Sequence, residues 1–190
     1  MARVTKGRIT TIEKLQVPIR ENALEVPTLH SFLKEFPWVL DPRWNLIADE
    51  KKYSALLLKH FPEADAPEVD RRIDFLCVRE GTQMVVVEIK RPHSKASIKE
   101  LGQIESYVHF MRETLANTTD PSFKFLQVVG YLLCGDLVST GSVRQKRMTL
   151  ENDGIFVRRY DDLLGMVERS HQEFLDQYER LRKLRLEGVS

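Results

Sequence analysis

The stretch RRIDFLCVREGTQMVVVEIKRP, residues 71–92, decides how we interpret this sequence. Two short apolar runs flank a glycine-containing turn, a pattern typical of a β-hairpin. Three charged residues interrupt the runs: Asp74, Glu88 and Lys90. An ionised side chain is costly to bury unless it is paired or binds a metal. The positions of these three charges therefore need a chemical explanation.

The geometry of a hairpin brings the charges together. With Gly81 at the centre of the turn, Asp74 lies opposite Glu88, and their β-carbons are roughly 5 Å apart. Because side chains alternate along a strand, Asp74, Glu88 and Lys90 share one face at the open end of the hairpin. We expect the opposite face to be wholly apolar and to carry Ile73, Phe75, Cys77, Val85, Val87 and Ile89.

Two carboxylates at this separation repel each other unless one is protonated or a cation lies between them. Oxygen ligands favour Mg²⁺ or Mn²⁺ over zinc. Lys90 on the same side could orient a water or stabilise charge on a phosphate oxygen. The competing interpretation is a structural cross-strand ion pair, which is common at the open end of a hairpin. Because both strands are apolar on both faces, they should be central, and this favours the chemical interpretation.

Composition indicates one globular domain. The chain has 190 residues, 42% hydrophobic and 30% charged, and its net charge is +1. Nucleic-acid binding would therefore need a local basic patch, since there is no global positive field. We find no signal peptide and no apolar run long enough to span a membrane, so we expect a cytoplasmic protein with no membrane partner. Cys77 and Cys134 lie in apolar runs and are expected to be reduced core residues.

Apolar periodicity and turn residues predict the other elements. We expect helices at 21–36, 95–116 and 161–187, with the first beginning near Pro27. We expect further strands at 123–135 and 154–160. Residues 1–20 form either a leading strand or a linker, residues 53–61 either a strand or a helix, and residues 139–147 a basic, flexible connection. The order predicts an α/β fold with a mixed central β-sheet flanked by helices.

The order of these features resembles the core of the PD-(D/E)XK nuclease superfamily. In that core an Asp is followed by a hairpin, by a Glu-X-Lys at the end of an apolar strand, and then by a helix. The helix carries LGQIESY, with Gln103 and Tyr107 in the Gln-X-X-X-Tyr spacing that many of these families have. The upstream segment LHSFLKEFPWVLDPRW, residues 29–44, resembles the Pro-Trp signature before the nuclease core in the Shedu family of bacterial anti-phage defence proteins. The resemblance covers residues 25 to about 135 and implies a restriction-endonuclease-like core in a domain spanning 21–190, preceded by an extension or linker at 1–20.

The resemblance implies a metal-dependent phosphodiesterase that acts on DNA. Asp74, Glu88 and the backbone carbonyl of Ile89 would bind Mg²⁺, for which Mn²⁺ should substitute. Lys90 would position the attacking water, and Gln103 would support the water or the substrate. Many members carry a further Glu on the first helix. Glu25 is our candidate for this ligand, ahead of Glu35.

The segment KRPHSKASIK, residues 90–99, is rich in basic residues beside the proposed site. Such a run is often only a solvated loop. Next to a nuclease site it would also supply phosphate contacts. Our candidates for nucleic-acid contact are Arg91, His93, Lys95, Lys99 and, on the following helix, Tyr107. Weaker candidates are Arg144, Lys146, Arg147, Arg158 and Arg159.

The C-terminal helix carries an apolar seam of alternating three- and four-residue steps: Leu164, Val167, His171, Phe174, Tyr178 and Leu181. This seam could pair helices between subunits or pack on the chain's own sheet. The Shedu resemblance implies oligomers and a possible sensor domain or protein outside this chain. We predict a Mg²⁺-dependent DNA endonuclease of bacterial defence. The alternatives are a non-catalytic nucleic-acid-binding or assembly module of the same fold, and a nuclease acting on RNA or branched DNA.

Overall fold

The computed structural model describes residues 2–22, 28–52, 72–79, 83–117 and 127–187. The predicted first turn at Pro27 and the undecided segment 53–61 lie outside these residues. No helix in the described part of the chain is both long enough and apolar enough to cross a membrane.

A five-stranded mixed sheet forms the centre of the molecule, in the order β1-β2-β3-β5-β7. Its strands are β1 (Trp44–Lys52), β2 (Arg72–Arg79), β3 (Gln83–Ile89), β5 (Gln127–Cys134) and β7 (Ile155–Arg159). The first three strands are antiparallel, and β3, β5 and β7 are parallel. A small second sheet pairs β4 (Lys95–Ala96) with β6 (Asp136–Leu137). The mixed sheet of the predicted fold class is confirmed.

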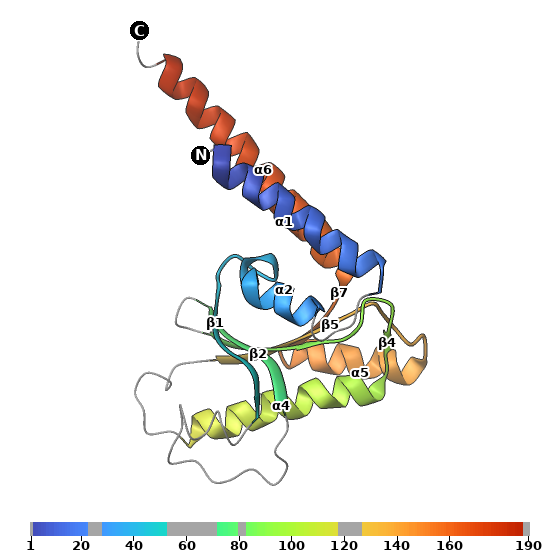
Figure 1. Ribbon diagram of the computed structural model, residues 1–190. Coiled ribbons are helices and arrows are strands. Elements are labelled where there is room, and N and C mark those ends of the chain that lie inside the picture. Colours follow the sequence, from blue (N-terminus) through green and yellow to red (C-terminus); the bar gives the residue numbers. More distant parts are fainter. Residues whose placement is uncertain (1, 23–27, 53–71, 80–82, 118–126, 188–190) are drawn as a thin grey trace.

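Helices cover both faces of the sheet (Figure 1). On one face lie α4 (Ile98–Ala116) and α5 (Gly141–Asn152). On the other face lie α2 (His30–Glu35), a short 3-10 helix (Pro37–Val39), and the bases of α1 (Ala2–Arg20) and α6 (Tyr160–Glu187). This arrangement is the sheet flanked by helices that we predicted.

Helix α4 is fixed at its start and along its length. Ser97 and Glu100 form a capping box, in which the side chain of each residue accepts a hydrogen bond from the backbone N–H of the other. A β-carbon on Gly130 of β5 would lie 2.6 Å from a Val108 side-chain atom of α4. Glycine at this position therefore lets α4 lie close to the sheet, which sets the distance from α4 to β3.

Helices α1 and α6 run antiparallel and project from the sheet as an arm, with α6 reaching beyond the start of α1 (Figure 1). Gln16 of α1 donates a hydrogen bond to Glu168 of α6 at 3.0 Å. The buried aliphatic residues of α1 are spaced three and four apart, as expected for one helix face: Ile12, Leu15 and Ile19. Our expectation of a strand or linker at 1–20 is wrong, because this apolar face packs against a helix far along the sequence.

Helix α5 replaces the flexible connection expected at 139–147. Thr140 caps its first turn by accepting a hydrogen bond from the Val143 amide. Only Val143 and Leu150 are buried in this helix, so its sequence lacks a visible apolar stripe. The Thr140 cap and the packing of α5 on β7 therefore make this segment a helix.

One further expectation needs correction. Ile73 belongs to the core under α4, with Leu76, and not to the opposite face. The alternation of side chains along β2 is therefore interrupted around Asp74. Ile98, in the first turn of α4, is 43% exposed. Strand β1 is not among the strands that the sequence predicts.

Candidate active site

The hairpin has the register that the sequence predicted. Phe75 pairs with Val87, and Cys77 pairs with Val85, so Asp74 and Glu88 stand at the next step towards the open end. Phe75, Cys77, Val85 and Val87 are all buried in the core on the α2 side. The carboxylates therefore come together on the other face, under α4.

Asp74 is held by the backbone of the neighbouring strand. The amide of Ile89 donates a hydrogen bond to Asp74 Oδ2 at 2.8 Å. Burial raises the pKa of Asp74, against the opposing effects of the Ile89 amide, the Lys90 charge and a hydrogen bond with Glu88. Desolvation therefore favours the protonated form of Asp74 when no cation is bound beside it.

Glu88 is the centre of the cluster and is only 3% exposed. Its Oε1 accepts a hydrogen bond from Lys90 Nζ at 2.6 Å and another from Gln103 Nε2 at 2.7 Å. Its second oxygen, Oε2, is buried as well. The ion pair with Lys90 compensates the cost of burying the carboxylate. All four predicted catalytic residues, Asp74, Glu88, Lys90 and Gln103, are thus brought together.

Tyr107 lies behind Gln103. Gln103 Nε2 donates to the Tyr107 hydroxyl at 2.6 Å, and Tyr107 is 3% exposed. Burial, together with the negative charge of Glu88, raises the pKa of the Tyr107 hydroxyl. We predicted that Tyr107 contacts nucleic acid. The buried ring instead orients the Gln103 amide.

The backbone at the site is supported from the arm side of the sheet. The hydroxyl of Tyr160, the first residue of α6, donates to the Lys90 carbonyl oxygen at 2.7 Å. His30 of α2 stacks on Phe75, with ring centroids 4.4 Å apart, and its Nε2 lies 3.2 Å from the Asp74 carbonyl oxygen. Sequence reasoning missed both supports. No local pattern could reveal them, because each joins residues that are far apart in the chain.

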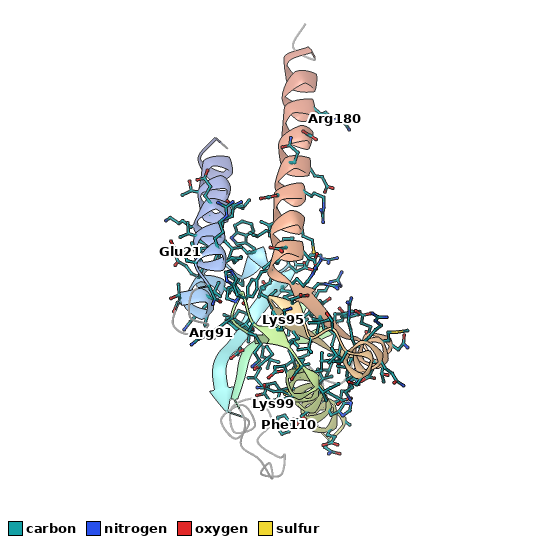
Figure 2. The ribbon with its side chains drawn as sticks, turned by 90° about the vertical axis from the view of Figure 1, so that its right-hand side faces the viewer. Glu21, Arg91, Lys95, Lys99, Phe110 and Arg180 are labelled. Carbon is teal, nitrogen blue, oxygen red and sulfur yellow. The ribbon has the colours of Figure 1, made fainter. Side chains whose placement is uncertain are left out.

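The basic segment after β3 is accessible. Arg91, His93, Lys95 and Lys99 are all exposed. Figure 2 shows Lys95 at the foot of the arm and Lys99 near α4, whereas Arg180 stands far out on α6. The His93 amide donates to Asn22 Oδ1 at 3.0 Å, which ties this segment to the end of α1. These positions are compatible with the predicted phosphate contacts, which stay predictions.

The donor set suits a hard divalent cation. The Glu88 carboxyl is buried and that of Asp74 beside it is half-buried. Two ionised acids here would repel each other, and desolvation makes ionisation of Asp74 costly, so a cation would relieve both penalties. In the described part of the chain, no group of three or more His, Cys, Asp or Glu residues is placed to hold a metal. Further ligands would come from the Ile89 carbonyl and from water. Glu25 lies outside the described residues, and Glu35 is exposed on α2.

Both cysteines are buried and free, as predicted. Burial raises the pKa of Cys77 to about 12 and that of Cys134 to about 11. These thiols stay protonated at neutral pH and are poor nucleophiles. They are core residues and take no part in the candidate site.

No protein-family model matches the chain, and no curated protein matches its sequence. Among solved structures, a complex of EndoMS with dsDNA is similar at 21% identity and a TM-score of 0.46, over 69% of this chain and 42% of that one. A repair endonuclease from Pyrococcus abyssi is similar at 19% identity and a TM-score of 0.45, over 69% of this chain and 44% of that one. This chain thus spans less than half the length of either.

Proposed function

We propose that this protein is a metal-dependent DNA endonuclease. The observation that carries the proposal is the contact of Lys90 Nζ with Glu88 Oε1 at 2.6 Å, beside the half-buried carboxyl of Asp74. A lysine and two acids at the open end of a central hairpin are poorly explained by stability, because a buried ion pair contributes little net stabilisation. They are well suited to hydrolysis of a phosphodiester.

Asp74, Glu88 and the Ile89 carbonyl would hold Mg²⁺ or Mn²⁺. The bound ion would supply Lewis acidity and lower the pKa of a water molecule. Lys90 would position that water for attack on phosphorus and stabilise negative charge on the phosphate. The Gln103 amide, oriented by Tyr107, would hold the Glu88 carboxylate or the water in place. The water oxygen would bond to phosphorus as the bond to the 3′ oxygen breaks. The attacking water would lose a proton to solvent and the leaving 3′ oxygen would take one up, giving a 5′-phosphate and a 3′-hydroxyl.

A role in bacterial anti-phage defence is the finer part of the proposal. It is supported by the resemblance of residues 29–44 to the Shedu signature. Self-association through the arm and a sensor outside this chain belong to the same proposal. Light scattering of the purified protein would test self-association, and phage plating on cells that express the wild type or Lys90→Ala would test defence.

The first experiment is cleavage of supercoiled, nicked and linear plasmid with Mg²⁺, Mn²⁺ or EDTA. Wild type is compared with Lys90→Ala and with the matched control Lys14→Ala, which removes an exposed lysine from α1. We expect metal-dependent cleavage by wild type and the control, and none by Lys90→Ala. Equal cleavage by Lys90→Ala would show that the site is wrongly placed. No cleavage by wild type, together with metal-independent DNA binding, would favour the non-catalytic module.

A further inference from the structure

A cavity of about 300 Å³ lies beside the candidate site, between β6, the start of α5 and the end of β7. Its polar lining includes three arginines, a threonine and two aspartates: Arg144, Arg147, Arg159, Thr140, Asp136 and Asp162. None of the catalytic residues named above lines it. The cavity is therefore a separate feature of the same edge of the sheet.

The strand pairing places the cavity relative to Lys90. The amide of Lys90 donates to the Leu133 carbonyl of β5 at 2.8 Å. Arg159 of β7 pairs with Cys134, the residue after Leu133. Neighbouring strands are about 4.8 Å apart, so the backbone of Arg159 lies about 10 Å from that of Lys90. Both residues stand at the carboxyl ends of parallel strands, the edge at which α/β sheets bind ligands.

The side chains of the two sites also share a face. Ile155 and Val157 of β7 lie in the core under α4, and Val157 lines the cavity together with Arg159. Glu88 bonds Gln103 of α4, so it is on the α4 side as well. A strand of nucleic acid lying along this edge would therefore meet the candidate active site and the cavity in succession.

The arginines are available to an anion. Arg144 is exposed and forms no ion pair with the residues that the structure describes. Arg147 pairs with Glu151 at 2.8 Å and Arg159 with Asp162 at 3.1 Å, and both arginine side chains are more than 40% exposed. Exposed pairs of this kind contribute little and exchange readily for a better anion. Arginine binds phosphate oxygens through two parallel N–H bonds.

The charge of the lining selects among phosphates. Three arginines and two aspartates give a net charge of only about +1, which matches a phosphodiester monoanion and disfavours a phosphomonoester dianion. A β-carbon built on Gly141 has no atom within 4 Å, so the space beside this residue at the start of α5 is open.

We propose that this cavity binds a backbone phosphodiester of the substrate strand, close to the bond that is cut. The separation between the two sites is about 10 Å along the edge of the sheet, the width of two strand spacings. The assignment to a substrate strand rests on the proposed function. The contact would fix the position of the strand without reading its bases, since phosphate contacts carry no direct sequence information.

The test measures binding of a fluorescent DNA duplex by anisotropy in EDTA, where no metal-dependent cleavage occurs. The variants are Arg144→Ala, Arg159→Ala and the double variant. The matched control is Arg180→Ala, which removes the same charge from the exposed outer part of α6. We expect each cavity variant to weaken duplex binding about tenfold and to reduce the salt slope by about 0.9 for each phosphate that the protein no longer neutralises. The control should change both quantities much less.

A second measurement separates this inference from the proposed function. A small diester such as bis-p-nitrophenyl phosphate cannot reach from the candidate active site to the cavity, so its hydrolysis by wild type in Mg²⁺ reports on the candidate active site alone. If wild type cleaves neither this diester nor plasmid DNA, but the cavity variants bind the duplex more weakly, the proposed function fails and the phosphate site stands. Duplex binding and salt slope equal to those of Arg180→Ala, in variants with wild-type melting temperature, would overturn the inference. So would weakened binding of inorganic phosphate with unchanged duplex binding.

Discussion

The cluster around Glu88 and the arginine-lined cavity lie on one edge of the sheet, but they differ in burial and in the partners of their charged side chains. The cluster around Glu88 is buried, and its carboxylate is bonded by Lys90 and Gln103 within the protein. The cavity beside it is lined by three exposed arginines, two of which pair with surface carboxylates. The first arrangement holds a few atoms in a fixed geometry at a cost in stability. The second keeps its charges available at little cost. Catalysis requires the former, and holding a long anionic strand requires the latter.

The largest effect is expected at the buried carboxylate. Glu88→Gln keeps the shape of the side chain but removes the negative charge that pairs with Lys90. We expect DNA cleavage to fall by about 10³-fold or more, as for other groups that organise charge in a reaction. Initial rates of plasmid nicking in Mg²⁺ would measure this.

The matched control is Glu35→Gln, which removes a carboxylate from the exposed surface of α2. It should leave the rate within about twofold of wild type. A larger decrease in the control than in Glu88→Gln would mean that the metal-binding acid lies on the first helix.

A smaller effect is expected from the support behind Lys90. Tyr160→Phe preserves a fully buried ring and removes only the hydroxyl that donates to the Lys90 carbonyl. We expect kcat to fall about tenfold, because a misplaced lysine costs rate, while duplex binding stays unchanged. Single-turnover cleavage and anisotropy on the same samples would separate the two quantities. An equal decrease in binding would show that the hydroxyl stabilises the whole edge.

Asp74→Asn should show how much ionisation of Asp74 lowers the free energy of unfolding. Burial raises the folded-state pKa of Asp74, so the folded protein holds that proton more tightly than the unfolded chain. The stability of the wild type is then greatest below the unfolded pKa and falls as pH rises towards the folded pKa. Asparagine cannot ionise and can still accept the Ile89 hydrogen bond. We therefore expect the variant to melt a few degrees higher than wild type at neutral pH, and the difference to vanish in acid.

Thermal unfolding in EDTA from about pH 3.5 to pH 8 would measure this difference. Adding Mg²⁺ should then raise the melting temperature of the wild type, because an ion that binds the folded state stabilises it. The melting temperature of Asp74→Asn should stay unchanged, because the variant lacks a carboxylate ligand for the ion. A wild type that is more stable than the variant at every pH in EDTA would contradict the assigned direction of the Asp74 pKa.

Much of the candidate site was predictable because its parts are close together in the sequence. The hairpin register follows from one short turn, and Asp74 and Glu88 are then opposed by the geometry of the ladder. Gln103 could be placed because α4 has a regular apolar stripe and a capping box. The role of Tyr107 could not be predicted, because its exposure depends on how closely α4 packs on β5 at Gly130.

The sequence by itself determined the hairpin, the helices α4 and α6, and the meeting of Asp74, Glu88 and Lys90. Short-range periodicity and turn geometry specify these features, and no distant contact is needed to recognise them. Only the tertiary structure decided that residues 2–20 form a helix against α6, that α5 is ordered over β7, and that Tyr160 supports Lys90 from 70 positions along the chain. Such contacts leave no local pattern in the sequence. They are stabilised by burying apolar surface between segments that are far apart in the chain.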